Sequence, residues 1–344
     1  MTAQEDPWRV AEAGWPSAGD PTAKLAFALR YAVLAPSGHN TQPWRFRPRP
    51  GGMDLLADRS RALPVVDPED RALVISCGAA LGLLRLALRR FGHAGVVEIL
   101  PAPGEPDLLA RIGLGPAHVP TPEELRRFSA IPHRHSVRGP HAPDPLPADL
   151  APALHIVAAE ERVELALATE PAVRERIAAL VEEGDRAQFA NLAFRAELAR
   201  WIRAHSLGAR DGMSARGFGL PDAASPLFAL AIRHIDLGAT VGAQDHARAS
   251  GAPAPMLLAT PGEAPRDWLA TGQALALLLL EATAAGVRAA FLNQPVEVPT
   301  LRPRLREAAG VEGQPQVLLR LGLAPEGPAS ARRGAAEVLE TQRG

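Results

Sequence analysis

A short loop at residues 35–44, with the sequence APSGHNTQPW, carries the polar groups that are best suited to bind a ligand. Its turn exposes backbone N–H groups, and its side chains add a hydroxyl and two amides at short intervals. The residues concerned are Pro36, Ser37, Gly38, His39, Asn40 and Gln42. Such groups match the polar edge of a planar heterocycle, whose carbonyl and N–H positions need fixed partners. The alternative interpretation is an ordinary loop from a helix to a strand, anchored by Trp44.

A second segment, residues 134–138 with the sequence RHSVR, could bind an anion. Because alternate residues of an extended chain share a face, Arg134, Ser136 and Arg138 are predicted to project together. Two guanidiniums that flank a hydroxyl suit a phosphate, since arginine binds phosphate with two hydrogen bonds and keeps its charge. The alternative is a basic surface linker.

The composition limits the class of protein. The chain has 344 residues, enough for two folded units or one large one. Apolar residues make up 47% and charged residues 22%, which excludes disorder of the whole chain. A net charge of -1 does not favour a nucleic-acid or membrane-surface partner. The start of the chain does not have the pattern of a signal peptide, and the apolar runs are too short to span a bilayer. We therefore expect a soluble, cytoplasmic protein.

Disulfide and metal chemistry are not expected. Cys77 is the single cysteine, and it lies in an apolar stretch, so we interpret it as a core residue. His133, His135 and His141 cluster near Asp144 without the spacing of metal ligands. We find no glycine-rich phosphate loop between a strand and a helix.

The pattern of apolar residues predicts the elements that must position these segments. Helices are predicted over residues 22–35, 67–92, 267–286 and 299–309. Another helix is predicted to start at residue 121, and helical patterns follow the predicted strand at 155–159 up to about residue 205. Strands are predicted at 44–46, 53–57, 96–100, 111–115, 155–159, 256–260, 289–292 and 316–324. Residues 207–226 are rich in Gly and Pro and predict a long loop, which is either a lid or a disordered connector. The last twenty residues form a tail.

Two parts of the chain resemble each other. The segment SCGAALGLLRLALRRFG from Ser76 aligns without gaps with ATGQALALLLLEATAAG from Ala270, and RIGLG at Arg111 resembles RLGLA at Arg320. The order helix, strand, helix, strand also repeats, which favours duplication over a chance likeness of two Leu/Ala helices. Duplication predicts a first half over residues 1–130 and a second over 131–344, with sites at the seam between them.

Together the two polar segments resemble the nitroreductase family of FMN-dependent oxidoreductases. In that family an Arg-x-Ser-x-[Arg/Lys] element precedes a helix and an Ala-Pro-Ser-x-x-Asn-x-Gln-Pro-Trp loop. Both elements are present here, but in swapped order and far apart. This arrangement looks like the Acg branch, in which two nitroreductase-like halves are fused. The resemblance implies an α+β fold: a mixed or antiparallel sheet flanked by helices, duplicated as an intramolecular pseudo-dimer.

The resemblance also implies residue roles. The FMN phosphate would be bound by Arg134 and Ser136, together with Arg332 or Arg333 of the tail, and Arg138 would lie near the N1/O2 edge of the isoalloxazine. The other cofactor-binding residues implied are His135, Pro36, Ser37, Gly38, His39, Asn40, Gln42 and Asn293. Two alternatives stay open: His39 could instead stabilise its loop, and Asn293 could instead satisfy its own turn.

Each motif occurs once, so we predict one FMN per chain. The resemblance implies NAD(P)H-dependent reduction of small acceptors, such as nitroaromatics or quinones, by hydride transfer through flavin N5, with no side chain named as an acid or base. The first alternative is a protein that binds and sequesters FMN with little turnover, because a lid would exclude both substrates. The second is a flavin-free interaction protein. The pseudo-dimer could be monomeric or could pair again as a homodimer.

Overall fold

Two antiparallel sheets with the same strand order organise the fold. The computed structural model describes residues 6–340, and its sheets have the orders β1-β2-β4-β3 and β5-β6-β8-β7. Neighbouring strands are antiparallel throughout. The strands are β1 (Trp44–Arg49), β2 (Gly52–Ala57), β3 (His93–Ile99), β4 (Leu108–Ala117), β5 (Glu164–Leu167), β6 (Ala254–Thr260), β7 (Val287–Phe291) and β8 (Gln314–Leu323). The repetition of this order confirms the predicted duplicated α+β architecture.

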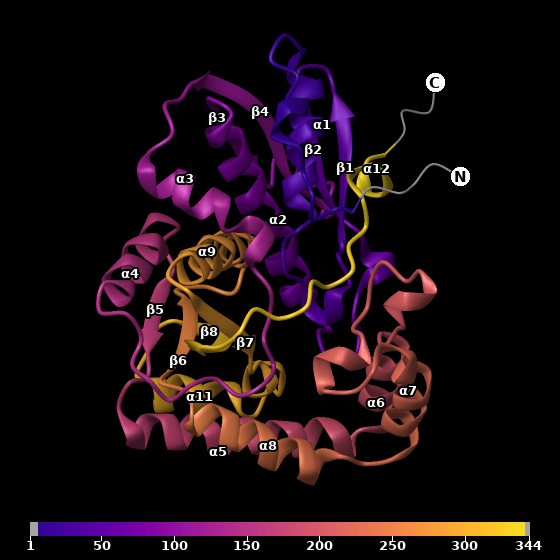
Figure 1. The fold of residues 1–344 in the computed structure, drawn as a ribbon, viewed down its shortest axis with the longest axis vertical. Helices are drawn as coiled ribbons and strands as arrows, with labels where there is room; N and C mark the ends of the chain where they lie inside the picture. The colour runs from indigo at the N-terminus through magenta and orange to yellow at the C-terminus, as the bar shows by residue number, and fades with distance from the viewer. Residues whose placement is uncertain (1–5, 341–344) are drawn as a thin grey trace.

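Two long helices, α2 (Arg71–Arg90) and α9 (Pro265–Ala284), pack against each other and join the two halves (Figure 1). Both are rich in Leu and Ala on nearly every side, and most of their residues are buried. Among residues 6–340, only α2 is long and apolar enough to cross a membrane, and 89% of its apolar window is buried inside the protein. Its apolar character is therefore explained by its place in the core.

Two glycines that the internal repeat aligns meet where these helices cross. A Cβ atom on Gly78 would lie 2.4 Å from the carbonyl oxygen of Leu269, and one on Gly272 would lie 2.0 Å from that of Ile75. The repeat also aligns Ile75 with Leu269, so the two contacts are the same contact seen from opposite halves. Such reciprocity is the signature of a two-fold interface. The halves therefore pack as an intramolecular pseudo-dimer.

The helix α4 (Leu150–Glu160) corrects the strand predicted over residues 155–159. A short apolar run fits a buried strand and a buried helix equally well, and HIVAA was such a run. In the structure Leu154, Val157 and Ala158 are buried at helical spacing. In chain order, α4 stands in the second half where α1 (Pro21–Ala32) stands in the first.

The start of α2 also differs from the prediction, which placed it at Asp67. Asp70 adopts a left-handed φ of 56°, which interrupts the helical path, and α2 begins at the next residue. The Asp67 carboxylate still acts as a cap, because it accepts the backbone N–H groups of Ala72 at 3.0 Å and Leu73 at 2.9 Å.

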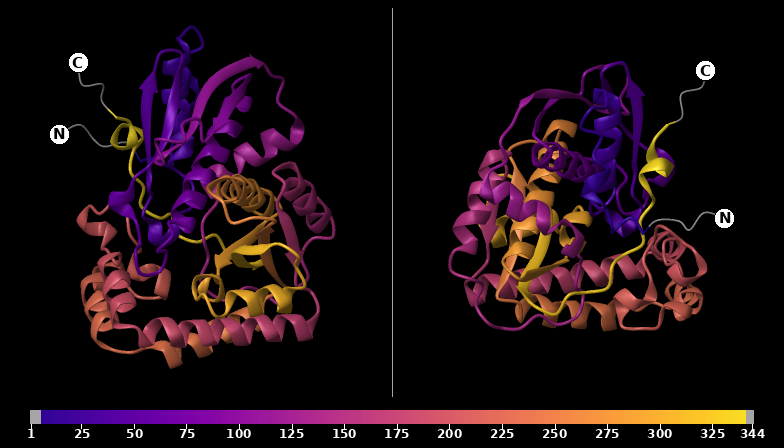
Figure 2. Two further views of the ribbon diagram at one scale, coloured as in Figure 1. Left: turned by 180° about the vertical axis from the view of Figure 1, so that it is seen from behind. Right: turned by 45° about the horizontal axis from the view of Figure 1, so that its top comes forward.

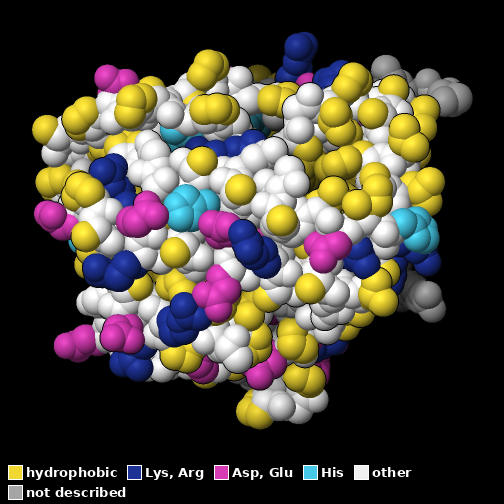
Figure 3. Space-filling view, turned by 90° about the horizontal axis from the view of Figure 1, so that it is seen from below, with side chains coloured by type: hydrophobic (Ala, Val, Ile, Leu, Met, Phe, Trp, Pro, Cys, Tyr) yellow, Lys and Arg dark blue, Asp and Glu magenta, His cyan; other side chains and the backbone are white. Residues whose placement is uncertain are grey.

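A large insertion distinguishes the second half from the first. Between β5 and β6 it places four helices: α5 (Pro171–Ala190), α6 (Leu192–Arg200), α7 (Ser225–His234) and α8 (Gly238–Ser250). Residues 207–226, predicted as a loop, contain only short 3-10 turns before α7 begins. Figure 1 shows α5 and α8 side by side beneath the second sheet, with α6 and α7 beyond them. Figure 3 shows hydrophobic side chains gathering on the side where α6 and α7 lie, and Leu227 is 72% exposed.

The tail returns to the first half. After β8 it runs across the molecule to α12 (Ala335–Val338), as Figure 2 shows. There the Glu340 N–H donates to the carbonyl of Phe46 in β1 at 2.8 Å. The remaining helices are α3 (Pro122–Ser129), α10 (Gln294–Glu297) and α11 (Arg302–Ala309). This crossing brings the arginines of the tail beside the loop at residues 36–42.

Candidate functional site

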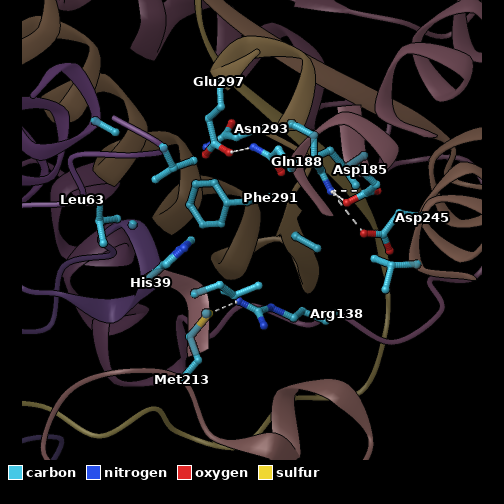
Figure 4. Close-up of a pocket in the computed structure, with 18 of the residues that line it drawn as sticks. His39, Leu63, Arg138, Asp185, Gln188, Met213, Asp245, Phe291, Asn293 and Glu297 are labelled. Carbon is cyan, nitrogen blue, oxygen red and sulfur yellow. Dashed lines mark hydrogen bonds between the residues drawn. The ribbon is translucent and has the colours of Figure 1, made fainter. Parts of the chain in front are cut away.

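A cavity of about 430 Å³ lies at the seam between the halves (Figure 4). The first half contributes residues 36–39 and the first turns of α2. The second half contributes Arg138, residues 290–294, Glu297 and the inserted helices. The apolar wall is formed by Leu63, Val66, Phe189, Phe194, Leu198, Phe228, Ile232, Leu237 and Val241. Mostly apolar lining with a few convergent polar groups is typical of small-molecule sites.

The loop at residues 36–42 reaches the cavity in a strained conformation. His39, Asn40 and Gln42 have left-handed φ angles of 47°, 56° and 52°. The Ser37 hydroxyl accepts the Gln42 N–H at 2.9 Å and closes the loop. Left-handed non-glycine residues persist only where their surroundings enforce them, and they gather at functional sites. The loop thereby presents residues 36–39 to the cavity.

The amide groups of Asn40 and Gln42 fasten neighbouring segments together. Asn40 Nδ2 donates to the carbonyls of Gly212 at 2.9 Å and Ala331 at 3.0 Å. Gln42 Nε2 donates to the carbonyl of Arg210 at 2.8 Å, and its Oε1 accepts the Arg333 N–H at 2.8 Å. Both amides are therefore used by the inserted segment and the tail, and neither residue lines the cavity.

Arg134 and Arg332 form a buried pair of cations. Arg332 Nη1 donates to Asn40 Oδ1 at 2.7 Å, and Arg134 Nη2 donates to the carbonyl of Leu34 at 3.2 Å. Both guanidiniums face the ring of Trp8, at 6.0 Å for Arg134 and 5.1 Å for Arg332. Within residues 6–340 neither has a carboxylate at ion-pair distance, and Arg332 Nε has no hydrogen-bond partner.

The electrostatics of this pair call for an anion. Burial lowers the pKa of Arg134 to about 10. Burial and the charge of Arg134 hold the pKa of Arg332 well below its usual value. Buried cations without counter-ions are unfavourable, so a phosphate or carboxylate between them would relieve both. Arg134 and Arg332 therefore have the properties of an anion site.

Arg138 and Arg320 place further positive charge on the cavity wall. Arg138 lies over the ring of Phe218 at 4.6 Å and donates to Met213 Sδ at 2.9 Å. Arg320, only 1% exposed, donates through Nη2 to the carbonyls of Arg138 and Gly139. Its Nε and Nη1 have no partner among residues 6–340. Both side chains thus have donor capacity left for a ligand.

Carboxyl groups occupy another wall (Figure 4). Gln294 Nε2 donates to Asp185 at 3.1 Å and to Asp245 at 3.3 Å, and Gln188 Nε2 donates to Glu297 at 2.7 Å. Burial, followed by the charge of Asp245, raises the pKa of Asp185 to about 8. Burial raises the pKa of Glu297 to about 7. This wall therefore holds acids that keep protons near neutral pH.

Comparison with known proteins assigns the family. No protein-family model matches the chain. The "Putative NAD(P)H nitroreductase Rv3131" of Mycobacterium tuberculosis is 30% identical over 91% of this chain and 90% of its own length. The "Putative NAD(P)H nitroreductase acg" of the same organism is 30% identical over 92% and 95%. The chain belongs to the nitroreductase family. It lies in the branch that contains Acg, as the two polar segments predicted.

Comparison with solved structures also finds nitroreductases among the similar chains. The FMN-dependent nitroreductase NfnB from Mycobacterium smegmatis, in complex with NADPH, is 18% identical, with a TM-score of 0.42. The match covers 64% of this chain and 99% of that one.

The predicted site residues other than Ser136 fall into three groups. Those that line the cavity are Pro36, Ser37, Gly38, His39, Arg138 and Asn293. Those that lie at or beside the anion site are Arg134, His135 and Arg332. Asn40, Gln42 and Arg333 do not line the cavity; they form hydrogen bonds that join the loop, the inserted segment and the tail. Of the two tail arginines left open, Arg332 is the one beside Arg134, since Arg333 donates to the carbonyls of Gln42 and Glu337.

The extended segment at residues 134–138 does not present one common face. Arg134 faces Trp8, Arg138 lines the cavity, and Ser136 is exposed and pairs with Ala289 of β7. The expectation that these side chains project together is wrong, because the segment follows two different neighbours, the tail and β7. Asn293 lines the cavity, and its Oδ1 accepts the Leu318 N–H of β8 at 2.9 Å, so its amide oxygen is bonded to a neighbouring strand and not within its own turn.

Buried histidines should make stability fall in mild acid. Burial, then Arg138, lowers the pKa of His39 to about 4, and burial, then Arg134 and Arg332, lowers that of His135 to about 3. Below about pH 6.5 these histidines are protonated in the unfolded chain but stay neutral in the folded state. The free energy of unfolding should therefore drop by about 1.4 kcal/mol per pH unit for each histidine. The loss should continue down to these folded-state pKa values. Urea unfolding of the wild type and of the His39→Gln/His135→Gln variant, compared across that range, checks this; equal slopes would contradict it.

Several residues of the cavity were not predicted from the sequence. They are Asp185, Gln188, Asp245, Gln294, Glu297 and Arg320. The helical acids and amides look like the solvent-facing side of amphipathic helices, and nothing in one sequence shows that this side is covered. Arg320 could have been found from the sequence, because an arginine inside the apolar strand VLLRLGL is expected to be buried and to need polar partners.

Proposed function

We propose that this chain is an FMN-dependent NAD(P)H oxidoreductase that reduces small acceptors such as nitroaromatics or quinones. The observation that carries the proposal is the pair Arg134 and Arg332, two buried guanidiniums without a carboxylate within residues 6–340. They donate to Leu34 and Asn40, on either side of the loop residues 36–39 that line the cavity. The relatives named NAD(P)H nitroreductase support this class of reaction.

FMN fits the groups that lack partners. Its phosphate carries nearly two negative charges and would lie between Arg134 and Arg332. The unpartnered nitrogens of Arg320 and the guanidinium of Arg138 would face the polar edge of its ring system. Residues 36–39 of the loop would bind the ring from the other half. Ser136 and His135 lie between Arg134 and Arg138 in the chain, and the backbone of this segment would help to position the two arginines for FMN.

The proposed site is composite and single. It uses the loop of one half, residues 1–130, and the arginine segment of the other, residues 131–344. The pseudo-two-fold relation of the halves would create a second, equivalent position for FMN. Because each motif occurs once in the sequence, that second position lacks both the loop motif and the arginine motif. We therefore expect one FMN per chain.

The side chains bind, orient and exclude water. When bound, FMN supplies hydride transfer between a nicotinamide and an acceptor. Arg134 and Arg332 hold its phosphate, and Arg138 with Arg320 keeps positive charge beside its ring. The apolar wall, which includes Phe189 and Ile232, keeps water away from the acceptor.

Anaerobic reduction tests the function. The purified protein should be yellow, should bleach when NADPH is added, and should recover its colour when menadione follows. A protein that stays colourless after incubation with FMN would contradict the proposal.

Sequestration of FMN is the second candidate, and one observation favours it. The segment at residues 210–213 is fastened over the loop by Asn40 and Gln42, and Arg61 forms an ion pair with Asp211. A segment held in this way would slow the exchange of substrates. A yellow protein that NADPH does not bleach would support this candidate and exclude turnover.

A further inference from the structure

Two carboxyl groups of the cavity share one hydrogen-bond donor. Asp185 on α5 accepts from Gln294 Nε2 at 3.1 and 3.3 Å, and Asp245 on α8 accepts from the same nitrogen at 3.3 Å. Asp185 is only 3% exposed, and within residues 6–340 no basic side chain lies at ion-pair distance from it. Two carboxylates so close together are unfavourable when both are ionised, so one of them keeps a proton.

The neighbours decide which carboxyl keeps the proton. Asp245 is ion-paired with Arg248 at 2.8 Å, which stabilises its charged form. From α10, Glu297 faces the same group and adds negative charge, while Arg248 of α8 opposes this in part. Burial and Asp245 together raise the pKa of Asp185 to about 8. Asp185 is therefore the protonated member near neutral pH.

We propose that Asp185 is the proton donor for acceptors reduced in this cavity. This inference rests on the function proposed above. Reduction of a quinone to a hydroquinone needs a hydride and a proton. The hydride, which originates on NAD(P)H, forms one new bond at the quinone; the O–H bond of Asp185 breaks as an O–H bond forms on a quinone oxygen. NAD(P)⁺ and the Asp185 carboxylate remain, and a proton from solvent restores the acid.

The other polar groups of the cavity suit this role less well. His39 is neutral, because burial lowers its pKa to about 4, so it has no imidazolium proton to donate. Arg138 and Arg320 hold their protons too tightly to donate them near neutral pH. Burial raises the pKa of Glu297 to about 7, which is below the pKa of Asp185, so a larger share of Glu297 is ionised at neutral pH. Of these two acids of the cavity, Asp185 has the higher pKa, and its side chain is buried.

Two acceptors separate proton donation from electron transfer. Menadione takes up protons when it is reduced, whereas ferricyanide takes one electron and no proton. In Asp185→Asn, turnover with menadione should fall by about a hundredfold, the usual contribution of a general acid. Turnover with ferricyanide and the rate of bleaching by NADPH should not change. Glu183→Gln, on the same helix in an exposed pair with Arg304, is the matched control and should behave like the wild type.

Two further measurements keep the inference testable. The infrared absorption of protonated carboxyl groups in the wild type should contain a component that disappears as pH rises through the pKa of Asp185, and this component should be missing in Asp185→Asn. If that variant does not fold, Asp185→Glu should retain both this component and menadione turnover. Unchanged menadione turnover, or an equal loss with ferricyanide, would overturn the inference. A wild-type protein that NADPH cannot bleach would instead contradict the proposed function, and the infrared component would still report on Asp185.

Discussion

Replacing Arg134 or Arg332 by alanine should weaken FMN binding by about 1.5–3 kcal/mol each, the usual range for a hydrogen bond to a charged group. This corresponds to roughly a ten- to hundredfold rise in Kd. The reason is that both guanidiniums are buried without a carboxylate within residues 6–340, so the phosphate would be their counter-ion. Quenching of FMN fluorescence on titration into the apoprotein measures the effect.

Riboflavin provides the sharpest control, because it has the ring system but no phosphate. The two variants and the wild type should bind riboflavin with similar affinity. Arg9→Ala removes an equal charge from an exposed position close to Trp8 and should leave FMN affinity unchanged. Unchanged FMN affinity in Arg134→Ala would remove this residue from the site.

Gly272→Ala should destabilise the fold by about 3 kcal/mol or more, the upper range for overpacking. The new Cβ would lie 2.0 Å from the carbonyl oxygen of Ile75 and 2.6 Å from the backbone nitrogen of Ala79. Both neighbours are backbone atoms in the centre of α2, so the two helices must move apart. Because these helices join the halves, the cavity at the seam should also lose its shape. The free energy of unfolding from urea titration measures the effect.

Gly104→Ala is the matched control for this change. A Cβ atom at Gly104 has no neighbour within 4 Å, so the free energy of unfolding should stay within about 1 kcal/mol of the wild type. If Gly272→Ala were as stable as this control, the close crossing of α2 and α9 would be contradicted.

The fold was predictable where the sequence carries a strong local pattern. The Leu/Ala repeat predicted both α2 and α9, because a helix that is apolar on every side must be central. The run HIVAA in α4 misled, since its apolar residues fit either type of element. The start of α2 at Arg71 depends on the left-handed backbone at Asp70, which no apolar pattern records.

The site was predictable only in part. The loop at residues 36–39 and Arg138 were identified from their motifs and line one cavity. Asn40 and Gln42 form hydrogen bonds to segments that are far away in the chain, near Gly212 and Arg333. The local spacing of residues could not predict these bonds. Burial and the charge of Asp245 raise the pKa of Asp185. Both causes arise only when the inserted helices pack together, so the sequence alone does not reveal them.

The central claim is a single FMN site built from both halves, and the stoichiometry of binding tests it most directly. Apoprotein of known concentration is titrated with FMN until fluorescence quenching ends. We predict saturation at one FMN per chain, with the same end point for the wild type and Arg9→Ala. Saturation at two FMN per chain, or no saturable binding, would contradict the account.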